Sequence, residues 1–202
     1  YSDLLHNFLG WGEGLMLVNE PQVKEILAIL EERFQTLIEE LISLPVQIFL
    51  APDNLDGQFI SPRTFKKALA PGYRQTTDIL HQHGTHLIVH VGGPIKHLLP
   101  HLADAGVDGI EGISGPPQSD ASLAEARDLV GPDQTLWGGI PQDVLLPTHD
   151  EKAFESTVKR AIQEAQADTR MMLGIADRVP PNADLKRLET IPKLIQEALS
   201  RA

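Results

Sequence analysis

The sequence carries, at residues 86–94, the stretch HLIVHVGGP, an apolar run that is interrupted by His90 and followed by two glycines and a proline. So short a run with apolar residues on both faces is typical of a strand in a parallel sheet. Four further runs share this character, at 46–50, 109–113, 135–137 and 170–173. Because longer helical patterns separate them, the chain predicts an α/β fold of five parallel strand–helix units.

The segments between these runs carry helical signals. Pro21 opens an apolar stripe at three- and four-residue steps that reaches Leu41. Ser61 and Pro62 form an N-cap followed by a proline at the first helical position. Residues 1–20 are expected to form a loop. The other expected helices run over 61–84 with a kink or break at Pro71-Gly72, over 94–106, over 121–130 capped by Asp120, over 151–165 capped by Asp150, and from Asp184 to the C-terminus.

Five units fit either part of a closed (β/α)8 barrel or an open doubly wound sheet. The first strand is not followed by G-x-G-x-x-G, so the dinucleotide-binding sheet loses its main support. A barrel needs eight units and typically about 250 residues. We therefore predict a single TIM-barrel domain over residues 1–202 that supplies about the last five βα units, with three units upstream of Tyr1. The open sheet is the alternative.

Composition narrows the classes of partner. The chain has 17 basic and 28 acidic residues and a formal charge of −11. Because phosphate binding needs clustered Lys and Arg, we expect neither a nucleic-acid nor an anionic-membrane surface. The chain contains no cysteine, which excludes disulfides and thiolate metal ligands within it. With no apolar run of membrane-spanning length and no signal-peptide pattern, a cytoplasmic protein is expected.

Polar residues follow every predicted strand, where parallel βα folds place their active sites. Each Asp or Asn there could instead cap a turn, and His90 could be a satisfied core histidine, but the set as a whole favours a pocket. Asp177 and Arg178 are either an internal ion pair or an arginine offered to a substrate carboxylate. The candidate catalytic residues are Asp53, His90 and Glu111, and the candidate substrate-binding residues at strand ends are Asn54, Gly92, Gly93, Gly139, Asp177 and Arg178.

His90 is the sharpest single candidate, because an imidazole with a pKa near neutrality suits proton transfer. No cofactor is expected. The alternative is a divalent metal bound by Asp53, His90 and Glu111, since oxygen and imidazole ligands suit several such ions. The histidines on predicted helices, at 81, 83, 97 and 101, are expected at the surface.

Several short motifs occur in a recognisable order. They are Asp53-Asn54 after a strand, Ser61-Pro62-Arg63-Thr64-Phe65 at a helix start, His90-Val91-Gly92-Gly93, Ala105-Gly106-Val107-Asp108-Gly109 and Leu136-Trp137-Gly138-Gly139-Ile140. Their order and spacing resemble the uroporphyrinogen decarboxylase superfamily, which includes the corrinoid- and coenzyme M-linked methyltransferases. The resemblance covers nearly the whole chain and implies a (β/α)8 barrel.

The chain differs from the family motifs at several positions, and these differences limit which activity the resemblance implies. In the methyltransferase branch a His-x-Cys-Gly motif and a later cysteine hold zinc, whereas here Gly92 stands at the cysteine position. The decarboxylase branch needs no metal, but its arginine-rich motif and catalytic aspartate belong to an N-terminal part. Its late Gly-His-Gly corresponds to Gly174-Ile175-Ala176 without the histidine, and Phe8 stands near the place of a tyrosine, which makes Phe8 a substrate-binding candidate.

The resemblance therefore implies a diverged member of the superfamily. We expect metal-independent decarboxylation of a tetrapyrrole or a related carboxylated small molecule. The alternatives are corrinoid- or folate-linked methyl transfer without a thiolate zinc site, and a barrel that binds a ligand without catalysis. A homodimer is left open.

Overall fold

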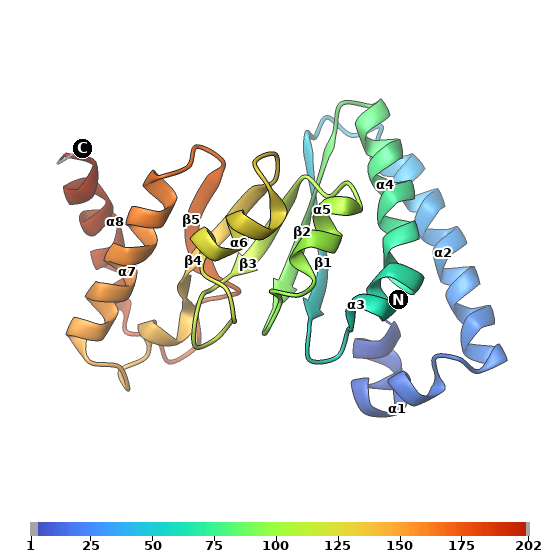
Figure 1. The fold of residues 1–202 in the computed structure, drawn as a ribbon, viewed down its shortest axis with the longest axis horizontal. Helices are drawn as coiled ribbons and strands as arrows, with labels where there is room; N and C mark the ends of the chain where they lie inside the picture. The colour runs from blue at the N-terminus through green and yellow to red at the C-terminus, as the bar shows by residue number, and fades with distance from the viewer. Residues whose placement is uncertain (1–3, 201–202) are drawn as a thin grey trace.

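The computed structural model describes residues 4–200 and contains one five-stranded parallel sheet in the order β1-β2-β3-β4-β5. Each strand therefore lies beside its neighbours in sequence, which is the order of a (β/α) barrel; a doubly wound sheet would reverse its order at a switch point. The prediction of five βα units of a barrel is confirmed (Figure 1). The strands are β1 (Ile48–Asp56), β2 (His86–Gly92), β3 (Gly109–Ile113), β4 (Thr135–Pro141) and β5 (Met171–Ala176).

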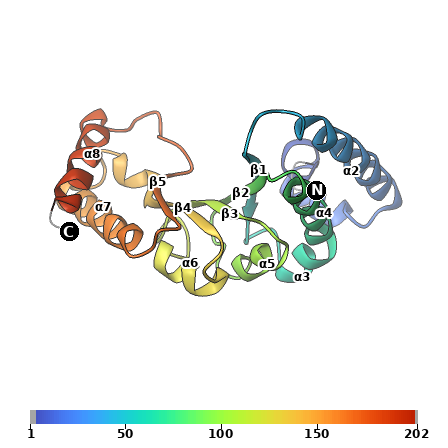
Figure 2. The ribbon, with the colours of Figure 1, turned by 90° about the horizontal axis from the view of Figure 1, so that it is seen from above.

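The helices that connect the strands lie along one side of the curved sheet. Viewed from above, α4 to α8 follow its convex side and leave the concave side uncovered (Figure 2). Within residues 4–200, no helix is both long and apolar enough to cross a bilayer. The helices are η1 (Leu4–Leu9), α1 (Trp11–Leu17), α2 (Pro21–Leu41), α3 (Pro62–Thr64), η2 (Phe65–Leu69), α4 (Ala70–Gln82), α5 (Leu99–Asp104), α6 (Leu123–Val130), η3 (Gln142–Leu145), α7 (Glu151–Gln166) and α8 (Leu185–Leu199).

Two of the three expected helix caps form, at Ser61 and Asp150, and Asp184, expected to start the last helix, caps it as well. The side chains of Ser61, Asp150 and Asp184 each accept a hydrogen bond from a backbone N–H of the first helical turn. The expectation for Asp120 is wrong, because Ser122 caps α6 in a capping box with Glu125. The Asp120 carboxylate instead accepts from the N–H groups of Ile95 and Lys96, 2.7 and 2.9 Å away, and so ties two neighbouring loops together.

Other boundaries differ from the prediction. Residues 4–17 form two short helices rather than a loop, and residues 1–3 of the expected loop lie outside the described part. The helix expected from Pro94 begins only at Leu99. Strand β1 runs on to Asp56, because a register irregularity between Ala51 and Leu55 lets it continue pairing with β2. Pro71 sits in the first turn of α4, after the π-helical η2, where its missing N–H costs nothing.

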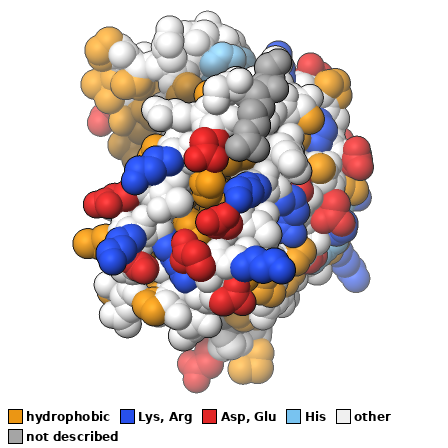
Figure 3. Space-filling model, turned by 90° about the vertical axis from the view of Figure 1, so that its left-hand side faces the viewer, with side chains coloured by type: hydrophobic (Ala, Val, Ile, Leu, Met, Phe, Trp, Pro, Cys, Tyr) orange, Lys and Arg blue, Asp and Glu red, His pale blue; other side chains and the backbone are white. Residues whose placement is uncertain are grey.

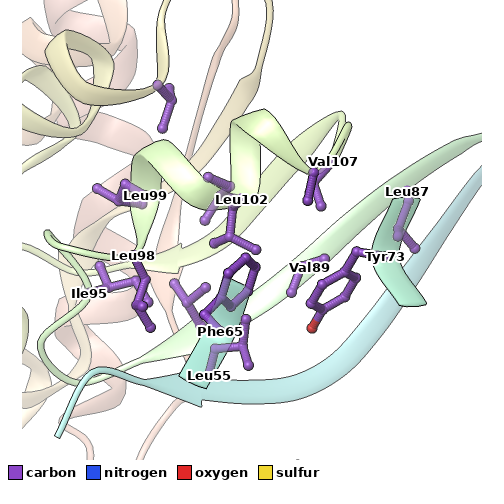
Figure 4. Close-up of a cluster of buried hydrophobic side chains, with 14 of the residues drawn as sticks. Leu55, Phe65, Tyr73, Leu87, Val89, Ile95, Leu98, Leu99, Leu102 and Val107 are labelled. Carbon is purple, nitrogen blue, oxygen red and sulfur yellow. The ribbon is translucent and has the colours of Figure 1, made fainter. Parts of the chain in front are cut away.

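The apolar core lies between the convex side of the sheet and the helices. Around α4 and α5 it includes Phe65, Tyr73 and Leu102, whose side chains point toward Val89 of β2 and Leu55 of β1 (Figure 4). A second cluster joins β4 to α7 and α8 through residues that include Ile140, Phe154, Val158, Ile191 and Leu194. On the outer surface over α7 and α8, acidic and basic side chains alternate around small apolar areas (Figure 3).

The concave side of the sheet keeps apolar side chains exposed. Phe49 and Ala51 of β1 pack against the core, so the alternating residues Ile48 and Leu50 point to the other side. Ile48 is 56% exposed and Leu50 49%. At the opposite edge, Met172 of β5 is 46% exposed. Both edges of the sheet thus present an apolar rim on the side where a barrel has its interior.

Candidate functional site

A row of side chains crosses the middle of the concave side. Strand pairing aligns His90 of β2 with Glu111 of β3, Glu111 with Trp137 of β4, and Trp137 with Met172 of β5. Residues that are aligned in a parallel sheet point to the same face. An imidazole, a carboxylate and an indole therefore stand side by side on the face that is free of helices.

The first two members of this row form a short hydrogen-bonded pair. His90 Nδ1 lies 2.5 Å from Glu111 Oε2, and the two side chains are only 16% and 11% exposed. The hydrogen bond to Glu111 raises the pKa of His90; burial works against this, and the charges of Glu111, Asp177 and Asp53 add to the increase. The imidazole thus keeps its proton to higher pH than an ordinary histidine, with Nε2 as its second N–H.

Gly112 provides the space that this pair needs. Its φ is +100°, and a Cβ built there would lie 2.2 Å from the carbonyl oxygen of Val91 and 3.1 Å from His90 Nδ1. Any side chain would therefore collide with β2 and press on the imidazole, in a backbone conformation that favours glycine. The strand irregularity between Glu111 and Ile113 centres on this residue.

Trp137, in the motif Leu136–Ile140, is a member of the row that the sequence did not predict as a site residue. Its indole lies against Gly174 of β5, where a Cβ would come within 2.6 Å of Trp137 Nε1. The sequence signal that could have identified it is strand alternation, because Trp137 must face the side of the sheet opposite to Leu136, and the structure places Leu136 in the core.

Asp53 and Asn54 lie within β1, at its irregular segment. The hydroxyl of Tyr73, in α4, donates a short hydrogen bond to Asp53 Oδ2. Burial raises the pKa of Tyr73 well above its usual value, and the Asp53 charge and hydrogen bond raise it further. One oxygen of Asp53 is thus held by the helix layer, while the carboxylate still acts on His90 through space.

Asn54 has a φ of +47°. Its side-chain oxygen, Oδ1, lies so close to Gly92 that a Cβ on Gly92 would be only 2.6 Å from it. Gly92 is therefore explained by close packing against β1. Gly93 adopts a φ of +58° and faces the carboxylate of Asp56 in the same way. These four residues form a tight polar junction between the ends of β1 and β2.

Asp177 and Arg178 follow β5. Asp177 has a φ of +69° and accepts a 2.9 Å hydrogen bond from Gln142 Nε2. Arg178 is exposed and lines a shallow pocket with Gln142, Asp143 and Val179. Two interpretations of these residues were open, an internal ion pair and an arginine available to a substrate. Among residues 4–200 the side chains of Asp177 and Arg178 form no ion pair with each other, and the Arg178 side chain is exposed after β5.

Two further candidates lie elsewhere. A Cβ at Gly139 would meet Leu123 of α6 at 2.7 Å and Ala161 of α7 at 3.4 Å, so this glycine permits helix packing on the convex side. Phe8, in η1, is 73% exposed. His101, expected at the surface, packs instead against Phe65 with 6.4 Å between ring centroids.

The alternative metal site at Asp53, His90 and Glu111 does not assemble. In the described part of the chain, the one group of three or more His or acidic side chains with mutually close ligand atoms is His81, His86 and Asp108, at the other end of the sheet. The row on the concave side offers an ion-paired imidazole, and Asp53, His90 and Glu111 do not bring three ligand atoms close to one another.

Comparison with known proteins places this geometry in a family. The model of the family uroporphyrinogen decarboxylase (URO-D) matches residues 13–198. No curated protein matches the chain by sequence. Among solved structures, a methyltransferase from Methanosarcina mazei is similar in fold, with a TM-score of 0.69 and 14% identity; the match covers 93% of this chain and 53% of that one, so the chain spans about half of the methyltransferase. The strand order, the half-barrel and the match over residues 13–198 agree, and the chain belongs to the uroporphyrinogen decarboxylase (URO-D) family.

Proposed function

We propose that this chain forms part of an enzyme that removes a carboxylate from a small organic molecule, with His90 as the proton donor. The observation that supports it is the 2.5 Å pair of His90 and Glu111 in the middle of the concave face, together with the raised pKa of the imidazole. A buried imidazolium held by a carboxylate is a general acid that works at neutral pH.

The proposed reaction needs no cofactor, because His90 and solvent supply the proton and the substrate carbon keeps the electron pair. The bond between the substrate carbon and its carboxylate breaks, carbon dioxide leaves, and the electron pair remains on the substrate carbon. That carbon takes the proton from His90 Nε2, and solvent then returns a proton to the neutral imidazole. Glu111 stabilises the imidazolium before transfer and orients the ring through Nδ1. The sequence contains no cysteine, so this segment supplies no thiolate to a metal.

The surroundings of the pair support a large, partly apolar substrate with acid groups. Trp137 and the exposed Met172 offer apolar contact along the row. Arg178, exposed after β5, would pair with a substrate carboxylate. A tetrapyrrole with carboxylated side chains has this combination of an apolar ring system and a charged rim.

The test uses the full-length protein with uroporphyrinogen as substrate. We expect coproporphyrinogen to form, a His90→Asn variant to lose at least about 100-fold in rate, and a matched His83→Asn variant on the surface of the helix layer to keep the wild-type rate. No product from the wild-type protein would exclude decarboxylation of this substrate, and equal rates for the two variants would exclude His90 as the proton donor.

Methyl transfer is the second candidate, because the resemblance places His90 at the zinc-binding histidine of the methyltransferase branch and a methyltransferase shares this fold at 14% identity. Stoichiometric zinc in the full-length protein that is lost in His90→Ala, with methyl transfer from a corrinoid or folate donor, would favour it. Tight substrate binding without turnover of either kind would instead identify a ligand-binding barrel.

A further inference from the structure

A cluster of two histidines and an aspartate lies at the end of the sheet opposite to the candidate active site. His81 is near the end of α4, His86 is the first residue of β2, and Asp108 directly precedes β3. The chain passes from α4 into β2 at the top of Figure 1. His86 and His90 are four positions apart on one strand, so the cluster lies about 13 Å from the proposed proton donor.

The ring nitrogens of both histidines converge on one carboxylate. His81 Nε2 lies 3.0 Å from Asp108 Oδ1 and 2.9 Å from Oδ2, and His86 Nδ1 lies 3.0 Å from Oδ1. The two rings meet edge to face with 6.0 Å between centroids. One ligand atom from each residue lies within 4.8 Å of the other two.

The carboxylate is held in place independently of the histidines. Asp108 Oδ2 accepts a 2.8 Å hydrogen bond from the N–H of Leu87. The backbone of Asp108 bridges the strands as well, donating to the carbonyl of Leu87 and accepting from the N–H of Thr135. Burial acts to raise the pKa of Asp108, but the hydrogen bonds from Leu87 and from the two histidines outweigh it and lower the pKa, so the group is anionic at neutral pH.

The hydrogen bond from the N–H of Leu87 accounts for the position of the Asp108 carboxylate, but not for the orientation of the two imidazoles. They come from different elements, and either could turn to solvent, since their side chains are 42% and 56% exposed. Both nevertheless direct a nitrogen at the same oxygen. Such convergence of two imidazoles and a carboxylate is the donor set of a divalent transition-metal ion.

We propose that His81, His86 and Asp108 bind one divalent transition-metal ion of the zinc type, separate from the candidate active site. Zinc bonds of about 2.0–2.2 Å in a tetrahedron place ligand atoms about 3.3 Å apart. The distances from each imidazole nitrogen to the Asp108 carboxylate, now 2.9–3.0 Å, would lengthen by about 0.3 Å, and the two ring nitrogens already lie within 4.8 Å of each other. The ion takes the place of the N–H protons that now point at Asp108. Exposure of the histidines leaves the fourth position to water.

The ion would join α4, β2 and β3 at the end of the sheet where TIM barrels carry no catalytic groups. Its expected role is therefore stabilisation of the fold: an ion that binds the folded but not the unfolded chain raises the melting temperature, and the rise grows with the logarithm of the free ion concentration above the dissociation constant.

Calorimetric titration of the chelator-treated protein with zinc chloride tests the proposal. We expect one equivalent to bind, and His81→Gln and His86→Gln each to weaken binding at least about 10-fold, as loss of even an indirect partner of a metal commonly does. His83→Gln is the matched control, because that neighbouring imidazole contacts the carbonyl of Ile79 instead and should leave affinity unchanged. Absence of one-to-one binding, or equal affinity for all three variants, would overturn the site.

Two further variants locate the ion and guard against misfolding. Asp108→Asn keeps an acceptor for Leu87, so it should retain the circular dichroism spectrum while losing the zinc-dependent rise in melting temperature. If Asp108→Asn does not fold, His86→Gln replaces it in this experiment. Because His86 is exposed, this variant should fold and should also lose the zinc-dependent rise in melting temperature. His90→Gln should bind zinc as tightly as the wild type, whereas loss of binding there would move the ion to the concave face and refute the proposal.

Discussion

Replacing Glu111 with Gln removes the charge that holds the His90 proton but preserves the shape of the side chain. The amide oxygen can still accept a hydrogen bond from Nδ1. A hydrogen bond to a charged group is worth about 1.5–3 kcal/mol and a neutral one about 0.5–1.5 kcal/mol, so the folded state should lose about 1–2 kcal/mol. Little of this is screened by water, since the two side chains are 16% and 11% exposed.

The loss should depend on pH in one direction. The pKa of His90 is higher in the folded than in the unfolded chain, because of the Glu111 hydrogen bond and charge. A raised histidine pKa contributes stability that is fully present below the unfolded pKa and disappears as pH rises through the folded pKa. With an unfolded pKa of about 6.5, Glu111→Gln should destabilise the chain clearly at about pH 5.5 and only slightly at about pH 9.

Urea denaturation at the two pH values measures the loss, and NMR titration of the His90 ring measures its pKa. In the variant the His90 pKa should fall. The rate of the proposed decarboxylation should therefore begin to decrease at a lower pH than in the wild type, because His90 loses its proton earlier. Glu155→Gln is the control, because its exposed pair with Lys159 stabilises little and involves no histidine. An unchanged His90 pKa, or an equal loss of stability at both pH values, would refute the role of Glu111.

Three other substitutions test the scaffold of the site. Gly112→Ala should destabilise the chain by about 1–3 kcal/mol more than Gly131→Ala in urea denaturation, because both glycines have positive φ but only the first is crowded; equal losses would argue against the steric account. Tyr73→Phe leaves the Asp53 carboxylate without its donor and should cost about 1–2 kcal/mol at neutral pH, which denaturation at two temperatures would check; no change would mean that water replaces the hydroxyl. Arg187→Lys should lower the melting temperature by several degrees, because the two terminal nitrogens of the buried guanidinium donate to the carbonyls of Val144, Leu146 and His149, and a single ammonium cannot replace all three bonds; a melting temperature within one degree of wild type would contradict this.

Local signals in the sequence determined much of the architecture. The five apolar runs became the five strands, the caps at Ser61 and Asp150 formed as expected, and the last helix begins after Asp184 as predicted. Both kinds of signal depend on residues within a few positions of one another, which the order of amino acids specifies directly. The absence of cysteine likewise excluded a thiolate metal site in this chain before any coordinates were needed.

The tertiary structure alone decided which polar residues work together. His90 and Glu111 are 21 positions apart, and their pairing depends on the register of β2 against β3 and on the space at Gly112. Asp53, grouped with them from its place after a strand, is bound by Tyr73 of the helix layer. His81 and His86 were assigned to the surface or to a strand start, yet they meet at Asp108. Strand register and helix packing are set by contacts between segments that are distant in the sequence. A pattern along one chain does not show how close in space such segments lie.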